Sequence, residues 1–186
     1  AAREHLLLAV TIYRSQHNIR GEGRALTKLG EVYQRQRKFE LSLSNLERAL
    51  EIARMANDLR GIGWVLHNKG VTLLEARDYE QAHECLLEAL QQRQHIGDQR
   101  GICWTLHNLG RLYIKQAQFE EAMAALLLAQ LSFEQRQSQD GQKNQARLEE
   151  LRSKVGEIEF NRLHREVSPN PSLIISAQLK RYLEQK

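Results

Sequence analysis

The sequence predicts an all-α protein built from a repeated pair of helices. The stretch 100–110 closely copies the stretch 60–70, and a weaker copy occupies 20–30, so the chain has an internal period of 40 residues. Self-similarity at a fixed period of this size is the mark of a repeat array. The two prolines, Pro169 and Pro171, lie near the end of the chain, which leaves the first 168 residues without the strongest helix breaker.

The period sets the boundaries of the predicted elements. A half repeat (1–20) precedes repeats 21–60, 61–100 and 101–140, and the segments 141–167 and 168–186 follow. Each repeat offers a first helix (helix A, about 22–36, 62–76 and 102–116) and a second (helix B, about 39–56, 79–96 and 119–136). Polar links such as 57–61 and 97–101 separate B from the next A, and their glycines, Gly61, Gly97 and Gly101, can stop helices. Because the chain starts inside a repeat, we expect it to be a piece of a larger protein.

The last quarter departs from the repeat. Apolar residues at three- and four-residue spacing predict one long amphipathic helix from Gln142 to about Phe160; they are Leu148, Leu151, Val155 and Ile158. We expect this helix, within 141–167, to cap the last apolar face of the array. A short extra helix over about 172–185 should follow, with Asn170 as its cap and Pro171 in its first turn. One face of that helix carries Ile175, Leu179, Tyr182 and Leu183.

Composition excludes several classes of function. The formal net charge is +4, and most of it lies in residues 141–186, which argues against a nucleic-acid footprint on the repeats. Cys85 and Cys103 fit neither a disulfide framework nor a zinc spacing, and they indicate a reducing, cytoplasmic setting. No apolar run approaches a membrane span. We find no catalytic motif, no metal-ligand set and no cofactor fingerprint, so we expect a protein that is not an enzyme.

The third repeat resembles the tetratricopeptide-repeat (TPR) signature of small and large residues. The matching positions are Leu106, Leu109, Gly110, Tyr113, Ala122, Leu126 and Ala129. The first repeat matches with Ser42 in place of one alanine, the second departs at Lys69 and Leu73, and the closing proline of the family is missing throughout. The unit is similar to the 40-residue variant of kinesin light chain, of Leu-Gly-Asn-type polarity adaptors and of bacterial NTPase-linked signalling proteins. The resemblance implies a right-handed TPR superhelix of antiparallel helix pairs.

One face of each A helix carries the candidate binding residues. By helical spacing, Trp64, His67 and Asn68 share the face opposite Leu66 and Gly70. The matching residues are Trp104, His107, Asn108 and Arg111 in the third repeat, and Arg24 and Lys28 in the first. The resemblance places this face in the concave groove of the superhelix. Asparagine suits bidentate bonding to a peptide backbone, and tryptophan is a typical interface anchor. The alternative is that the tryptophans pack against each other and the turns.

These observations predict a protein–protein interaction scaffold that binds an acidic peptide or partner segment in the groove. A second hypothesis is a regulatory sensor segment of a larger signalling ATPase, motivated by the start inside a repeat. A third is a helical repeat that binds RNA, motivated by the basic tail and the tryptophan pair.

The N-terminal half repeat predicts a further contact. Without its own A helix, segment 1–20 should expose Leu6, Leu7, Val10 and Tyr13. Such a patch invites pairing with another chain, so we expect a concentration-dependent homodimer. The C-terminal helix is an alternative occupant of this patch or of the groove.

Overall fold

The computed structural model describes residues 2–185, which contain only helices and turns. The chain divides into two compact units, Ala1–Gly97 (unit 1) and Asp98–Lys186 (unit 2). The all-α prediction is confirmed. Among the described residues, no helix combines the length and the apolar character that crossing a membrane requires.

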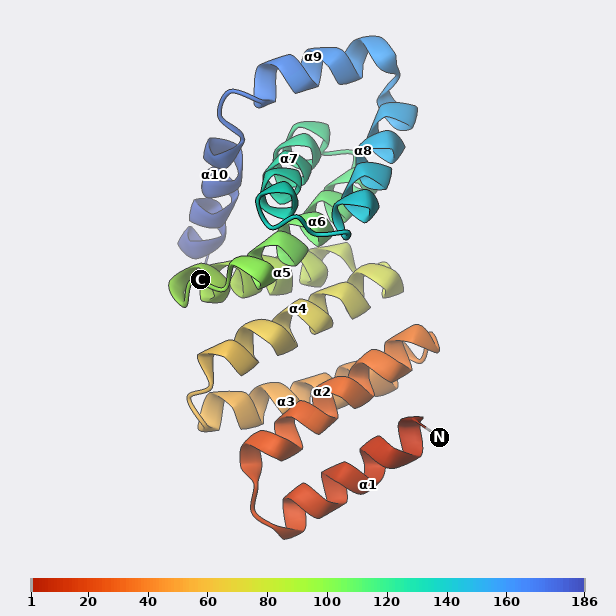
Figure 1. Cartoon of the computed structure of the whole chain (residues 1–186), viewed down its shortest axis with the longest axis vertical. Coiled ribbons are helices and arrows are strands. Elements are labelled where there is room, and N and C mark those ends of the chain that lie inside the picture. The colour runs from red at the N-terminus through yellow and green to blue at the C-terminus, as the bar shows by residue number, and fades with distance from the viewer. Residues whose placement is uncertain (1, 186) are drawn as a thin grey trace. The chain divides into compact units, whose positions relative to one another are not determined.

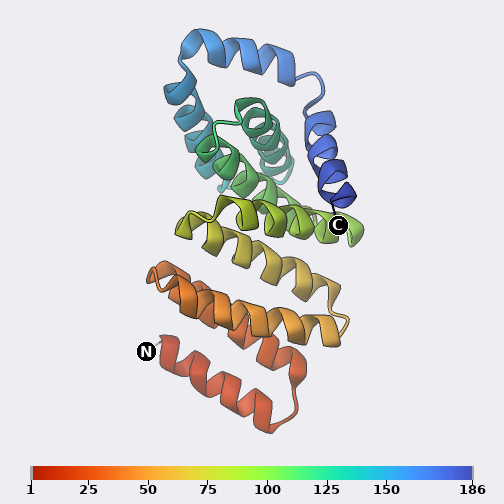
Figure 2. The same ribbon diagram turned by 180° about the vertical axis from the view of Figure 1, so that it is seen from behind.

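Unit 1 is a series of five antiparallel helices, each packed on the next (Figures 1 and 2). They are α1 (Ala2–Ser15), α2 (Ile19–Arg35), α3 (Phe39–Met55), α4 (Leu59–Ala76) and α5 (Tyr79–His95). The two A helices, α2 and α4, also contact each other. The core between them is apolar and includes Leu26, Leu46 and Leu66.

Unit 2 begins with one more helix pair and then changes its pattern. Its helices are α6 (Gln99–Lys115), α7 (Phe119–Gln135), α8 (Gly141–Val155), α9 (Glu157–Val167) and α10 (Pro171–Glu184). Helix α7 packs against α6, α8, α9 and α10, so it forms the centre of this unit. Both ribbon views show α8 and α10 on opposite sides of α7 (Figures 1 and 2).

The turns between successive helices share one backbone geometry. A residue with positive φ closes each turn from α1 to α8, and these residues recur every 20 positions: His17, Arg37, Asn57, Arg77, Gly97, Ala117 and Gln137. In the turn after α2, the amide of Lys38 donates to the carbonyl of Tyr33 at 2.9 Å. This is the Schellman pattern, in which a left-handed residue lets the chain satisfy the last carbonyls of a helix.

The A helices start earlier than predicted, and the link glycines do not stop them. Helix α4 begins at Leu59, and the carboxylate of Asp58 accepts a hydrogen bond from the amide of Gly61 at 2.9 Å. Asp98 caps α6 in the same way through Gly101. The prediction was wrong for these two glycines, because a side-chain cap lets each helix begin two residues before the glycine. It holds for Gly97, which has a φ of 67° and lies in the turn that ends α5.

A glycine at the same point of each A helix lets the paired B helix approach closely. A Cβ atom on Gly70 would lie 2.7 Å from Cγ of Leu86, and a Cβ atom on Gly110 would lie 2.6 Å from Cγ of Leu126. Both leucines are fully buried. The glycine cost of about 1 kcal/mol in a helix interior is therefore offset by close packing of the pair.

We expect Gly110→Ala to lower the free energy of unfolding by about 1 kcal/mol, because overpacking costs about 1–3 kcal/mol and better helix propensity returns about 1 kcal/mol. Urea unfolding measures the change. Gly141→Ala is the control, since a Cβ atom there would meet Phe133 at an ordinary 3.6 Å. A Gly110→Ala protein as stable as the Gly141→Ala protein would contradict the packing role.

Hydrogen bonds explain why Ser42 stands where the repeat signature has an alanine. The buried hydroxyl of Ser42 lies 2.9 Å from the carbonyl oxygen of Gly30, to which it donates, and 3.1 Å from the hydroxyl of Thr72. Ser42 therefore joins α2, α3 and α4 by polar contacts where an alanine would supply packing alone.

The predicted long helix after the repeats is two helices. Gly156, with φ of 85°, separates α8 from α9. The change of direction moves the buried face, so Ile158 is 90% exposed while Phe160, Leu163 and Val167 are buried. The prediction of one continuous helix was wrong because the glycine supplies a backbone conformation that other residues rarely adopt.

The C-terminal helix α10 packs within unit 2. Asn170 occupies the cap position of α10 without a side-chain bond, and Pro171 is in the first turn as predicted. Ile175 and Tyr182 are buried, whereas Leu183 is half exposed. Helix α10 packs on α7, and the Gln178 amide donates to the Glu121 carboxylate at 3.1 Å.

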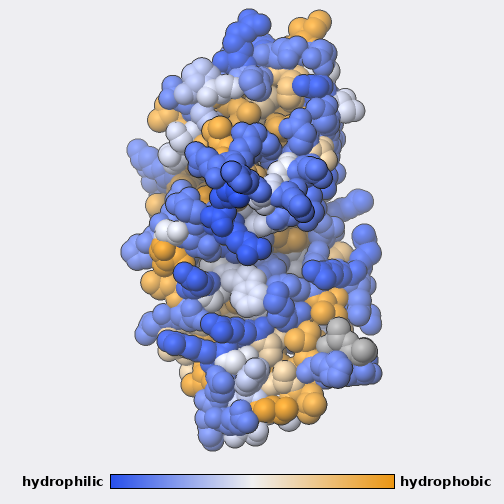
Figure 3. All heavy atoms as spheres, viewed as in Figure 1, coloured by the Kyte–Doolittle hydropathy of each residue, from blue (hydrophilic) through white to orange (hydrophobic). Residues whose placement is uncertain are grey.

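Of the four apolar residues of α1 that we predicted to be exposed, Leu7 is exposed, and Leu6 is half-buried. Val10 is buried in the core of unit 1, and Tyr13 packs against the same core. The large apolar side chains that α1 exposes are Leu7, Leu8 and Ile12. Hydrophobic atoms gather over this helix at the lower end of Figure 3. Homodimerisation stays a prediction.

Candidate functional site

The outer faces of α2 and α4 bring predicted site residues of unit 1 together. The ammonium nitrogen of Lys28 lies 4.7 Å from the centroid of the Trp64 ring, a cation–π distance. Lys28 also forms an ion pair with Glu31 at 2.9 Å, one helical turn further along α2. Because α2 and α4 pack together, residues 36 positions apart form one continuous surface.

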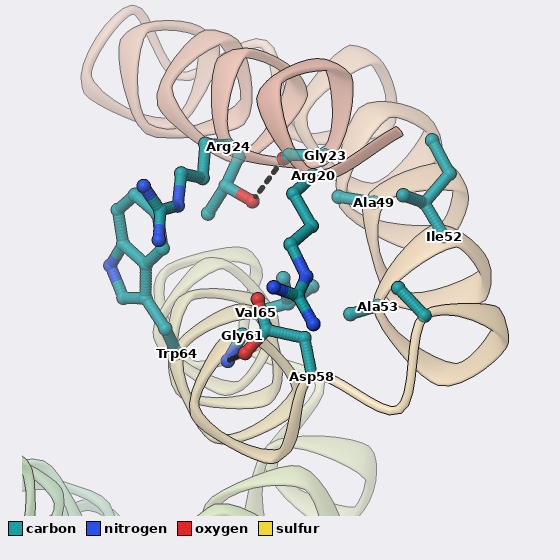
Figure 4. A pocket seen from close by; sticks show the side chains of 12 residues that line it. Arg20, Gly23, Arg24, Ala49, Ile52, Ala53, Asp58, Gly61, Trp64 and Val65 are labelled. Carbon is teal, nitrogen blue, oxygen red and sulfur yellow. Dashed lines mark hydrogen bonds between the residues drawn. The ribbon is translucent and has the colours of Figure 1, made fainter. Parts of the chain in front are cut away.

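A crevice lies beside this surface, between α2, the end of α3 and the start of α4 (Figure 4). Its volume is about 20 Å³, enough for on the order of one water molecule. Small residues, including Gly23, Ala49 and Ala53, line it. In Figure 4, Arg24 extends toward the Trp64 ring and Arg20 extends toward Asp58.

The two arginines carry uncompensated charge. Arg20 and Arg24 are exposed, and neither forms an ion pair or hydrogen bond with another residue of the part of the chain described, 2–185. The carboxylate of Asp58 serves as the cap of α4. The crevice rim therefore presents two guanidinium groups, which favour carboxylate and phosphate partners, next to an indole ring.

Asn68 lies on α4 one turn after Trp64. Its amide nitrogen donates to the carbonyl of Trp64 at 3.0 Å, and the side chain is half-buried. Its side-chain oxygen has no partner among residues 2–185, so it remains able to accept a hydrogen bond. His67 is half-buried beside it.

The equivalent residues of unit 2 are more enclosed. Trp104 makes edge contacts with His107 at 5.5 Å and with Phe133 at 5.4 Å between ring centroids. Asn108 is 5% exposed, donates to the Trp104 carbonyl at 2.9 Å and accepts from the Arg111 guanidinium at 2.8 Å. Both polar ends of Asn108 are therefore engaged, and Trp104 packs against His107 and Phe133.

His107 is buried in a hydrogen-bonded cluster with helix α8. Its Nδ1 lies 3.1 Å from the Asn144 side-chain oxygen. The Asn144 amide nitrogen donates to the Leu126 carbonyl at 2.9 Å and to the Gln130 side chain at 3.1 Å. Burial lowers the pKa of His107 to about 4, against the opposing effect of the Asn144 bond. His107 is therefore neutral near pH 7 and joins α6 to α8.

Sequence reasoning missed two residues of these sites. Arg20 belongs to the crevice of unit 1, and its repetition as Arg60 and Arg100 was a signal that could have singled it out. Asn144 stands one period after Trp104, so the repeat frame could have placed it on an A-like helix. Its fully buried contact with His107 could not be seen without the packing of α8.

The cysteines are placed as ordinary helix residues. Cys103 is buried, and its thiol donates to the Gln99 carbonyl at 3.0 Å. Cys85 is half-buried. Within residues 2–185, no three His, Cys, Asp or Glu side chains gather in a way that could hold a metal ion.

Antiparallel helix pairs joined by glycine contacts, with aromatic and polar side chains on the A helices, define a helical-repeat scaffold. The model of a family described as tetratricopeptide repeat matches residues 21–95 and 61–129. The chain belongs to the tetratricopeptide repeat family. Repeats of this family typically form non-enzymatic scaffolds for protein–protein interaction.

Two solved structures share the fold. The apo form of RapI is similar with a TM-score of 0.68 and 19% identity, over 99% of this chain and 50% of RapI. BtubC (BKLC) from P. vanneervenii is similar with a TM-score of 0.60 and 14% identity, over 97% of this chain and 78% of BtubC. This chain thus spans about half the length of RapI. A search of curated proteins found no match.

Proposed function

We propose that the chain is a protein-interaction module that binds an acidic peptide segment of a partner protein on the α2–α4 surface of unit 1. The observation that carries the proposal is the pair Arg20 and Arg24, which are exposed, form no ion pair within residues 2–185 and line one crevice with Trp64. Exposed guanidinium groups bind carboxylates in a bidentate manner, and an adjacent indole supplies apolar contact area.

Lys28 and Asn68 extend this surface. The Lys28 ammonium contacts both the Glu31 carboxylate and the Trp64 ring. An acidic side chain of a peptide can therefore take the place of Glu31 as its ion-pair partner. The open Asn68 oxygen can accept an amide hydrogen of a peptide backbone. In unit 2, Trp104 and Arg111 are the half-buried members of the predicted set, and His107 and Asn108 hold them in place.

The test measures fluorescence anisotropy of labelled extended peptides rich in Glu, with the same peptides carrying Gln as the neutral comparison. Arg24→Glu should weaken binding of the acidic peptides by at least about tenfold, or about 1.4 kcal/mol, because an attraction becomes a repulsion. Asn68→Ala should weaken it about three- to tenfold, since one neutral hydrogen bond contributes about 0.5–1.5 kcal/mol.

Arg3→Glu is the matched control, because it makes the same change of net charge at an exposed arginine of α1. Its affinity should stay within about twofold of the unmodified protein, allowing for long-range electrostatics. Asn68→Ala is cleaner than a double variant with Asn108, whose replacement would also break its bond to Arg111. Wild-type affinity in both Arg24→Glu and Asn68→Ala would overturn the proposal.

A further inference from the structure

A second crevice lies in unit 2 at the same position of the repeat. It is formed by the start of α6, the end of α7 and the turn into α8, and its lining includes Arg100, Trp104, Phe133, Arg136, Ser138 and Asp140. The residues 80 positions earlier, among them Arg20, Arg24, Ala53, Ala56 and Asp58, line the crevice of unit 1. Two repeats therefore form the same kind of hollow from equivalent positions.

The substitutions between the two crevices enlarge the second and change its chemistry. Phe133 and Arg136 stand where unit 1 has Ala53 and Ala56, and Ser138 replaces Asp58. The volume is about 190 Å³, against about 20 Å³ in unit 1. Each crevice is therefore lined by two arginines, but in the second Trp104 stands at the position of Arg24. The second crevice has thus acquired an aromatic wall, and it has lost the carboxylate at the position of Asp58.

The cations of this crevice have no anion of their own. Arg100 and Arg136 are exposed and form neither an ion pair nor a hydrogen bond within residues 2–185. The one carboxylate in the lining, Asp140, pairs with Lys143 at 3.0 Å. Lys143 in turn lies 5.2 Å from the centroid of the Trp104 ring, which adds positive charge next to the aromatic wall.

The aromatic wall is held by ring contacts. Phe133 is 3% exposed and meets Trp104 edge to face, and Trp104 is also held by His107. A wall fixed in this way needs no rearrangement to receive a ligand, which reduces the entropy cost of binding. The cavity volume accommodates an oxyanion together with an attached ring or a few water molecules.

We propose that this crevice is a separate binding site for an oxyanion group, a carboxylate or a phosphate, held between Arg100 and Arg136 with its attached carbon atoms against Trp104 and Phe133. The guanidinium fork matches the geometry of both groups, and an arginine lacking a protein partner keeps its full set of donors available. The site goes beyond the proposed peptide surface and uses neither Arg24 nor Asn68.

The experiment titrates the isotopically labelled full chain with benzoate, phenyl phosphate and benzamide at constant ionic strength, and follows the indole N–H signal of Trp104 by NMR. A Trp64→Phe variant assigns that signal. Benzoate and phenyl phosphate represent the carboxylate and phosphate sources, and benzamide is the neutral analogue. We expect a saturable shift with at least one oxyanion at about millimolar concentration and none with benzamide.

Arg100→Ala and Arg136→Ala should each weaken that binding at least fivefold, whereas Arg165→Ala, which removes an exposed arginine from α9, should change it less than twofold. Saturation with benzoate alone assigns a carboxylate ligand, and saturation with phenyl phosphate alone assigns a phosphate. The proposal is overturned if neither oxyanion saturates, if benzamide binds equally well, or if the double variant R100A/R136A binds as before. None of these results depends on the peptide titration of unit 1.

Discussion

Asn144→Ala should lower the free energy of unfolding by about 3 kcal/mol, because it leaves buried polar groups unpaired and opens a small cavity. The Asn144 side chain is fully buried and bonds to His107, to the Leu126 carbonyl and to Gln130. Truncation removes all three contacts, and α8 closes over the site, so water cannot easily replace them.

Urea unfolding monitored by circular dichroism measures this loss. Asn161→Ala is the control, because Asn161 is an exposed residue of α9 whose amide donates to the Glu157 carboxylate at 3.2 Å. Its replacement should change the stability by less than about 0.5 kcal/mol. Equal stability of the two variants would show that the buried cluster contributes nothing to joining α6, α7 and α8.

The free energy of unfolding should also decrease as the pH is lowered, because of His107. The pKa of His107 is about 4 in the folded chain, against an ordinary value of 6.5, because burial disfavours the charged ring. Above pH 6.5 both states are neutral, so His107 makes no difference there. As the pH falls below 6.5, the unfolded chain binds the proton first and is stabilised, by about 2 kcal/mol at pH 5 and about 3 kcal/mol below pH 4.

Unfolding curves at pH 7 and pH 5 test this dependence. His107→Gln should lose about 2 kcal/mol less than the unmodified chain between these two values, because its side chain cannot titrate. His164→Gln, which replaces an exposed histidine of α9, should retain the dependence. The assignment to His107 fails if the His107→Gln protein shows the same loss on acidification as the unmodified protein.

The repeat architecture could be predicted because it depends on contacts between residues close in sequence. Gly110 and Leu126 are 16 residues apart, within one helix pair, and the period exposes their relation directly. The end of the array was harder to predict. Apolar spacing continued through Ile158, but the conformation of Gly156 redirected the chain, and one residue outweighed the pattern around it.

The candidate site residues likewise include some whose surroundings follow from the repeat and some whose surroundings depend on the end of the array. Helical spacing put Lys28 and Trp64 on corresponding faces of neighbouring A helices, and the Lys28 ammonium lies 4.7 Å from the centroid of the Trp64 ring. The same reasoning grouped His107 with His67, yet His107 is 5% exposed while His67 is half-buried. The difference arises from α8, whose Asn144 covers His107. Periodicity describes what the repeats share, and it carries no information about the element that ends them.

The positive-φ residues, 20 positions apart, give the backbone a period half as long as that of the sequence. The spacing of the turns therefore does not distinguish A helices from B helices; the packing does, since the A helices α2 and α4 contact each other. A gain or loss of one 20-residue helix would keep the spacing of the turns but would place two A helices or two B helices in succession. A change of length by a whole helix pair keeps both the turn spacing and the glycine–leucine pairing, and six of the seven turns place a residue other than glycine in the left-handed region.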